Sequence, residues 1–182
     1  MSVTVSPTTF TFVSFDAEVI ERVADSLVQA LGMQDHPVSI EVDETTPLAR
    51  TRMEIGDTIA IHAESGAFED TRKPRQLSEN STATSLGRVL LRARDRLSGG
   101  FGEAPADADL SLAQMAAWET YCVGRLERLG ITANQQRWRY NFRNRHGFHD
   151  RSDGAFDLLW ASEGLTWGEL DEVSRTATLA DA

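Results

Sequence analysis

The chain has 182 residues, a length typical of one globular domain with a buried core. Its net charge of −10 disfavours nucleic acid and anionic membranes as partners, because it repels both at long range. The single cysteine, Cys122, excludes an intrachain disulfide and a cysteine-based zinc site. The N-terminus has neither a basic region nor a long apolar run, so we expect a cytoplasmic protein without a membrane span.

The first half of the chain is predicted to combine strands with one helix. Residues 9–14 alternate and are rich in β-forming side chains, which indicates a strand. A helix is expected over 17–31, because Asp16 is a suitable N-cap and Gly32 is a stop signal. Apolar and polar residues then alternate at 38–42, 51–55 and 59–63, which predicts three short strands. Such alternation is typical of an antiparallel or mixed sheet.

The second half of the chain is predicted to be mainly helical. A long loop is predicted near 65–84, followed by a helix at 84–97 and a flexible connection near 98–110. A second helix is predicted at 112–129, opened by a Ser111/Gln114 capping box, and a strand at 137–145. A helix at 153–161, a helix opened by a Thr166/Glu169 capping box and a frayed end at 176–182 complete the chain. The whole chain, residues 1–182, is therefore predicted to be one α+β domain. Its single mixed, largely antiparallel sheet of about five strands would be packed against three to five helices.

Positive charge is concentrated in one segment of this acidic chain. Residues 137–153 contain five basic and two acidic residues, a net charge of +3, whereas the rest of the chain has a net charge of −13. Read as a strand, the segment would bury one face and expose the other, because successive side chains point to opposite faces. The aromatic face would be Trp138, Tyr140 and Phe142, and the arginine face would be Arg137, Arg139, Arg143 and Arg145.

This arginine face suggests a non-catalytic interaction module that binds an acidic or phosphate-bearing partner, most simply a protein with an acidic surface. Three more arginines, spaced four residues apart on one predicted helix edge, would extend the face: Arg88, Arg92 and Arg96. The structural alternative is a balanced sheet surface, in which the arginines pair with Glu41, Asp43 and Glu54 on neighbouring strands. A nucleic-acid partner is a second alternative, disfavoured by the net charge and by the expected burial of the aromatic side chains. Nothing in the sequence indicates an oligomeric state.

A second hypothesis concerns four polar residues that follow the arginine segment. His146, His149, Asp150 and Asp153 have the residue types of a metal site or of a general base with its orienting carboxylate, so a metal-dependent hydrolase is an alternative function. The structural alternative is a polar turn in which Asp153 caps the next helix. Since two histidines three residues apart are common by chance, we expect neither a metal nor another cofactor.

The order of elements in the middle of the chain resembles that of a zincin-type metallopeptidase domain. A predicted strand at 58–63 is followed by a loop, an apolar helix at 86–97 and a second helix that begins near Met115. In that family the first of these helices holds the two zinc histidines and the catalytic glutamate. Here residues 86–97 contain no histidine and no glutamate, so the resemblance implies a degenerate domain without the zinc motif and without activity.

Overall fold

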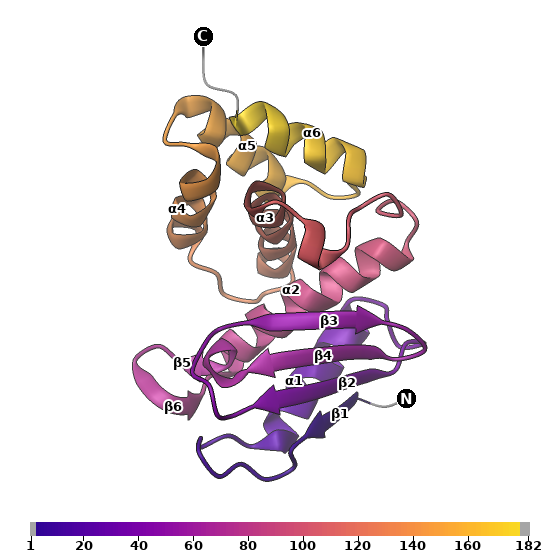
Figure 1. Cartoon of the computed structure of the whole chain (residues 1–182), viewed down its shortest axis with the longest axis vertical. Helices are drawn as coiled ribbons and strands as arrows, with labels where there is room; N and C mark the ends of the chain where they lie inside the picture. The colour runs from indigo at the N-terminus through magenta and orange to yellow at the C-terminus, as the bar shows by residue number, and fades with distance from the viewer. Residues whose placement is uncertain (1–2, 179–182) are drawn as a thin grey trace. The chain divides into compact units, whose positions relative to one another are not determined.

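The computed structural model of the protein describes residues 3–178 and confirms the α+β class. The described residues form six α-helices, a four-stranded mixed sheet and a two-stranded antiparallel sheet (Figure 1). They divide into two compact units, Met1–Arg94 and Asp95–Ala182, and the boundary falls within helix α2 (Glu79–Leu97). The expectation of one globular domain stays a prediction.

The four-stranded sheet belongs to the first unit and is built from β1 (Val3–Ser6), β2 (Val38–Asp43), β3 (Thr51–Ile55) and β4 (Ile59–Glu64). Its strand order is β1-β2-β4-β3. Its pairings β1–β2 and β2–β4 are parallel and its pairing β3–β4 is antiparallel. The expectation of a mixed sheet is therefore confirmed, but the expectation of about five largely antiparallel strands was wrong. The physical reason is helix α1 (Ala17–Ala30), which connects β1 to β2 as the crossover that a parallel pair requires.

The segment 9–14, predicted to be a strand, is a loop whose one bridge joins Ser14 to Gln76. Elsewhere in the segment a side chain holds the backbone. One carboxylate oxygen of Glu44, Oε2, accepts hydrogen bonds from the backbone N–H groups of Thr11 and Phe12 at 2.7 and 2.6 Å. The first strand, β1, lies earlier in the chain, where its four residues were too short a signal to predict.

The long loop predicted near 65–84 is instead a compact run of short elements: η1 (Ser65–Ala67), β5 (Glu69–Asp70), β6 (Lys73–Leu77) and the first turn of α2. Side chains stabilise this run locally. The carboxylate of Asp70 accepts a hydrogen bond from the N–H of Arg72 at 2.8 Å. Gly66 is required for close packing, because a Cβ there would lie 2.0 Å from the carbonyl oxygen of Pro47.

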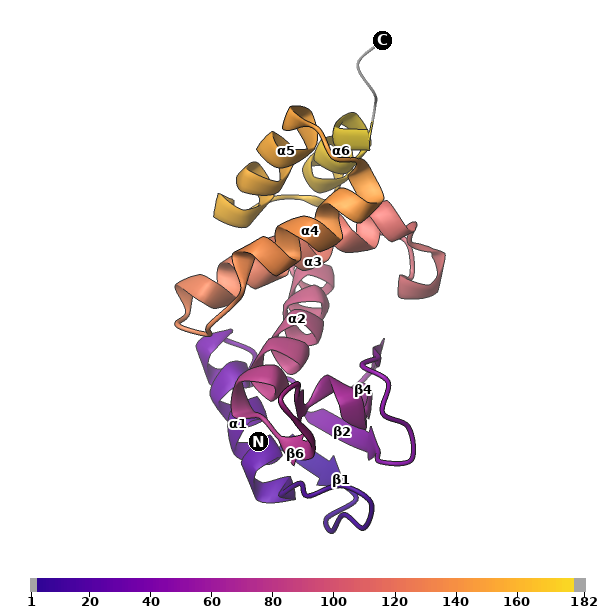
Figure 2. The ribbon, with the colours of Figure 1, turned by 90° about the vertical axis from the view of Figure 1, so that its left-hand side faces the viewer.

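One face of the four-stranded sheet packs on α1, and Figure 2 shows this helix on one side of the strands. Alternate residues of β2 and β4 point toward the helix and are almost fully buried: Val38, Ile40, Val42, Ile59, Ile61 and Ala63. They meet the apolar stripe of α1, formed by Ile20, Ala24, Leu27 and Val28. The predicted helix and the three predicted strands are therefore confirmed, because apolar periodicity and burial coincide in this unit.

The second unit is helical and is arranged around α3 (Leu112–Arg128), which contacts all three helices that follow it. These helices are α4 (Gln135–His146), α5 (Asp150–Ala161) and α6 (Trp167–Thr178). The capping boxes predicted at Ser111/Gln114 and Thr166/Glu169 are both present. Of the end predicted to be frayed, residues 179–182 lie outside the described residues. None of the helices in the described part of the chain combines the length and the apolar character needed to cross a bilayer.

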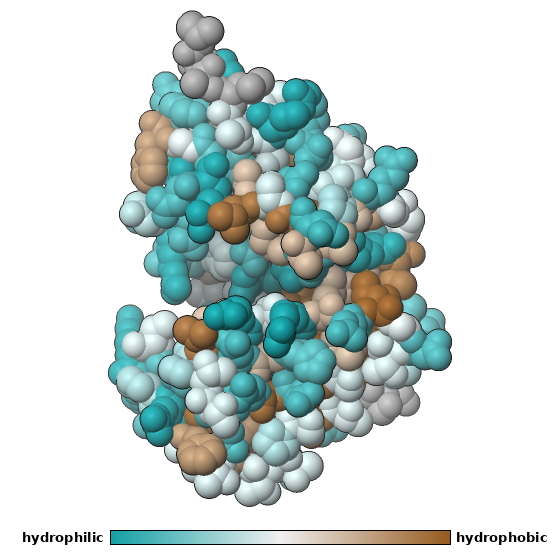
Figure 3. All heavy atoms as spheres, in the orientation of Figure 1, coloured by the Kyte–Doolittle hydropathy of each residue, from teal (hydrophilic) through white to brown (hydrophobic). Residues whose placement is uncertain are grey.

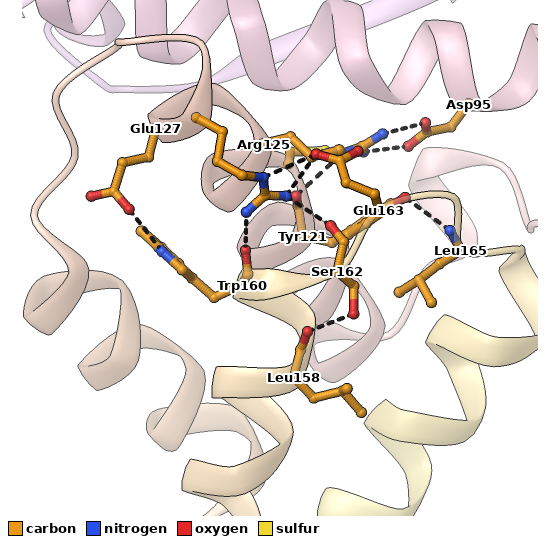
Figure 4. Close-up of polar contacts among 11 residues, drawn as sticks. Asp95, Tyr121, Arg125, Glu127, Leu158, Trp160, Ser162, Glu163 and Leu165 are labelled. Carbon is orange, nitrogen blue, oxygen red and sulfur yellow. Dashed lines mark hydrogen bonds and ion pairs between the residues drawn. The ribbon is translucent and has the colours of Figure 1, made fainter.

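A buried ion pair lies in the core of the second unit (Figure 4). Arg125 of α3 donates two hydrogen bonds to Asp95, at 2.8 and 2.7 Å, and Trp118 Nε1 donates a third at 2.8 Å. The side chains of the pair are only 4% and 7% exposed. The guanidinium group also lies over the ring of Tyr121, 3.7 Å from its centre. The Asp95 carboxylate therefore accepts a hydrogen bond at each oxygen, which offsets its removal from water.

We expect the substitution Arg125→Met to lower the free energy of unfolding of this unit by about 3–5 kcal/mol, because it leaves the buried Asp95 carboxylate without its cation. Urea denaturation followed by tryptophan fluorescence measures this unit specifically. All four tryptophans of the chain, Trp118, Trp138, Trp160 and Trp167, belong to it.

The matched control is Arg175→Met, which breaks the exposed ion pair with Glu172 and should change the stability far less. The double variant Asp95→Asn/Arg125→Met should recover part of the loss, because no uncompensated charge then stays buried. Equal losses in Arg125→Met and Arg175→Met would show that the buried pair does not stabilise the core.

Candidate functional site

The arginine-rich segment 137–145, predicted to be a strand, is helix α4. Its aromatic side chains alternate, but Trp138, Phe142 and His146 also follow one another at intervals of four, the spacing of one helix face. The helix begins after Asn134, whose side chain accepts a hydrogen bond from the N–H of Arg137 at 3.0 Å. It ends at Gly147, whose φ of 106° favours glycine.

The helical geometry separates the aromatic residues that the strand interpretation had placed together. Phe142 is buried and stacks on His146, whereas Tyr140 is 57% exposed. Tyr140 meets Phe148, which is 62% exposed, edge to face at 5.9 Å between ring centres. The exposed residues on this side form a surface that we name the α4 outer face: Arg137, Tyr140, Asn141, Asn144, Arg145 and Phe148.

The four arginines of α4 are divided by the fold into two pairs. Arg143 donates two hydrogen bonds to Asp153 of α5, at 2.7 and 2.6 Å, and Arg139 forms an ion pair with Asp157 of the same helix. The hydrogen bond from Arg143 holds the pKa of Asp153 below its usual range. Arg137 and Arg145 are exposed and form no ion pair with any residue in the described part of the chain.

The balancing carboxylates are therefore not the ones that the sequence suggested. Glu41, Asp43 and Glu54 belong to the sheet of the first unit, where Glu41 pairs with His62 at 3.0 Å. The carboxylates that neutralise α4 come from the next helix in the chain. A helix cannot present alternate residues to a neighbouring strand, so the predicted cross-strand pairing was wrong for this geometric reason.

Both candidate catalytic histidines have structural roles. His146 is buried, and its Nδ1 donates to the carbonyl of Phe142 at 3.1 Å while its Nε2 accepts from the hydroxyl of Ser174 at 2.9 Å. Burial lowers the pKa of His146, although the bond to Phe142 opposes this shift. The tautomer follows from the partner, because a carbonyl oxygen can only accept.

His149 is the N-cap of α5, the role that had been predicted for Asp153. Its Nδ1 accepts from the N–H of Ser152 at 3.2 Å, and its Nε2 donates to the carbonyl of His146 at 3.1 Å. Asp150 is exposed in the first turn of α5, where its negative charge interacts favourably with the helix dipole. Within residues 3–178 the structure shows no group of three or more His, Cys, Asp or Glu side chains placed to hold a metal ion.

The arginines of α2 do not form the exposed edge that their spacing predicted. Arg92 is buried and Arg88 is half-buried. Arg96 pairs with Asp107 at 2.7 Å and donates to the carbonyl of Pro105 at 2.7 Å, so it anchors the connection that follows α2. Helical spacing identifies residues on one side of a helix but does not decide whether that side faces solvent.

One feature of the first unit was missed by the sequence interpretation. A cavity of about 360 Å³ lies where β2 and β4 end, and its lining includes Arg50, Arg52, His62 and Glu64. Arg52, His62 and Glu64 belong to strands β3 and β4, and Arg50 directly precedes β3. The cavity itself was not predictable, because it depends on the parallel alignment of β1, β2 and β4.

Comparison of the chain with models of protein families, with curated proteins and with solved structures gives no match. The zincin-like and hydrolase hypotheses therefore stay predictions.

The buried His146 gives an expected pH dependence. Its pKa in the folded protein lies below the usual 6.5, so the unfolded chain binds more protons below that pH and the stability of the second unit falls as the pH drops. We expect the urea midpoint, followed by tryptophan fluorescence, to be lower at mildly acidic than at neutral pH. The substitution His146→Gln should reduce this difference, although it lowers the midpoint at both pH values.

The control is His36→Gln, because His36 lies in the first unit, outside the helical core that the tryptophans report. It should leave the pH difference unchanged. An undiminished difference in His146→Gln would show that another group is responsible for the acid sensitivity.

Proposed function

We propose that the protein is an interaction module that binds an acidic segment of a protein partner through the α4 outer face. The observation that supports this proposal most directly is the placement of two arginines without ion pairs to described residues on the same side of α4 as the exposed ring of Tyr140, which meets Phe148 just after the helix. Tyrosine and arginine, together with tryptophan, are enriched among the residues that contribute most of the binding energy of protein interfaces. Exposed apolar surface rimmed by polar residues is typical of protein interaction sites.

Only the arginines of α4 that have no ion pair within the described part of the chain would contact such a partner. Arg139 and Arg143 already have carboxylate partners on α5, so they support the helix and are not available for binding. Arg137 and Arg145 would meet carboxylate or phosphate groups of the partner. Tyr140 and Phe148, held edge to face, would cover its apolar side chains. An acidic segment with interspersed apolar residues matches both properties.

A protein partner fits this surface better than a nucleic acid. The second unit contains 14 acidic and 9 basic residues, so the surroundings of α4 repel a polyanion. Nucleic-acid binding usually relies on several arginine or lysine contacts to phosphates. The α4 outer face offers two unpaired arginines, which suit a few local carboxylates.

Fluorescence anisotropy with three labelled probes tests the proposal: a peptide with glutamate and leucine at helical spacing, the same peptide with lysine for glutamate, and a short single-stranded RNA. We expect only the acidic peptide to bind, with an affinity that falls as salt is added. The double variant Arg137→Glu/Arg145→Glu should weaken this binding by about tenfold or more, because it places like charges opposite each other. Tyr140→Ala should also weaken it.

The matched control is Arg72→Glu/Lys73→Glu, which makes the same change in net charge at two exposed residues of the first unit. It should leave binding of the acidic peptide nearly unchanged. Equal weakening by both double variants would reduce the effect to net charge alone. Tighter binding of the RNA than of the acidic peptide would replace this proposal with a nucleic-acid function.

A further inference from the structure

The cavity of the first unit lies at the edge of the sheet where open α/β folds bind their ligands. Because β1, β2 and β4 are parallel, their carboxyl ends meet at one edge, and Asp43 at the end of β2 is in register with Glu64 at the end of β4. The cavity, of about 360 Å³, is lined by residues from these ends and from the segments that follow them. Its position and size are typical of small-molecule sites.

The face of the sheet that contributes to the cavity is polar. Residues of β2, β3 and β4 that point away from α1 include Glu41, Arg52, His62 and Glu64. Figure 3 shows the side of the first unit that Figure 1 presents, where hydrophilic and intermediate residues predominate over apolar ones. A ligand held there would be recognised mainly through charges and hydrogen bonds.

Most charged groups around the cavity already have partners inside the protein. Glu41 pairs with His62 at 3.0 Å. The carboxylate of Asp43 accepts hydrogen bonds from Thr45, which hold its pKa below the usual range. Glu44 accepts from the backbone of the loop after β1. These groups shape the wall of the cavity, and their bonding capacity is largely used.

Two side chains of opposite charge, Glu64 and Arg52, still have hydrogen-bonding capacity that the described part of the protein does not use. Glu64 forms an ion pair with Arg50, with 3.7 Å between Oε2 and Arg50 Nε, but its carboxylate accepts no hydrogen bond from any described residue. Arg52 is exposed and forms no ion pair with a residue of the described chain. Arg52 lies opposite His62, so Arg52 and Glu64 occupy diagonal positions about 7–8 Å apart on the same face of the β3–β4 pair.

We propose that this cavity binds a free α-amino acid, with the ammonium group on Glu64 and the carboxylate on Arg52. A zwitterion satisfies both groups at once, which neither a simple amine nor a simple carboxylic acid does. The long side chain of Arg52 can reach across the diagonal to a ligand seated beside Glu64. The proposal concerns the first unit alone and does not depend on the α4 outer face.

The lining also indicates which amino acids fit best. Four carboxylates line the cavity, Glu41, Asp43, Glu44 and Glu64, against two arginines, Arg50 and Arg52. This excess of negative charge favours a ligand with a basic side chain. Lysine and arginine should therefore bind more tightly than leucine, and glutamate should bind most weakly.

Titration of the full-length protein with L-lysine, followed by amide chemical shifts, tests the proposal. We expect saturable shifts in β3 and β4 with a Kd on the order of 1 mM or tighter, the range of a small polar ligand. Nα-acetyl-L-lysine, which lacks the α-ammonium group, should bind at least about tenfold more weakly, because that group makes the ion pair with Glu64. L-glutamate should give the smallest shifts of the panel.

Two variants test the assigned contacts separately. Glu64→Gln and Arg52→Gln should each weaken L-lysine binding severalfold, with the larger loss for Glu64→Gln. The matched control is Glu54→Gln, which removes a charge from the same sheet face outside the cavity and should leave the Kd unchanged. Thermal melting confirms that each variant is folded, and Arg52 is exposed, so its substitution does not disturb the core.

Three results would overturn the proposal: no saturable shifts with L-lysine, equal binding of L-lysine and its Nα-acetyl form, or equal losses in Arg52→Gln and Glu54→Gln. The last result would reduce the binding to nonspecific attraction of a cation by an acidic surface. None of these results affects the α4 outer face, whose test uses different probes and different variants.

Discussion

The buried pair of Arg125 and Asp95 is the interaction on which the helical unit depends. Two charged side chains at the centre of a core are tolerated only when their hydrogen bonds are made inside the protein. The Asp95 carboxylate has three such bonds, two from Arg125 and one from Trp118. These bonds fix α3 in one orientation, and α3 in turn supports the three helices that follow it.

Aromatic side chains around this pair also contact α6 and the connection after α2. Phe101 stacks on Trp118 at 4.8 Å, and Trp118 contacts Trp167 at 5.5 Å. The hydroxyl of Tyr121 accepts the N–H of Leu165 at 3.0 Å, just before α6 begins. Gly124 of α3 allows α5 to approach closely, since a Cβ there would lie 2.1 Å from the carbonyl oxygen of Trp160. The helices on which α4 packs, α3, α5 and α6, are therefore themselves closely packed together.

The two candidate sites use charge in different ways. On α4 the fold neutralises Arg139 and Arg143 with carboxylates of α5 and leaves Arg137 and Arg145 without an ion pair among the described residues. At the carboxyl edge of the sheet, the fold satisfies most carboxylates internally and leaves Glu64 and Arg52 with spare bonding capacity. In both places the informative groups are those that the protein does not fully pair within itself. Residue type alone does not reveal such groups.

Local patterns in the sequence were enough to determine α1, the strands β2 to β4 and both capping boxes, because each depends on residues a few positions apart. The nature of α4 was not determined in this way, since its aromatic residues fit a period of two and its inner face fits a spacing of four. Tertiary structure decided between them: Phe142 and His146 are buried against α5 and α6, and Asp153 and Asp157 come within reach of Arg143 and Arg139. The parallel order of the sheet was also a tertiary outcome, because β1 is only four residues long and is defined by its pairing with β2. Which arginines are paired and where strand ends meet depend on distances between segments far apart in the chain, and the sequence alone does not specify those distances.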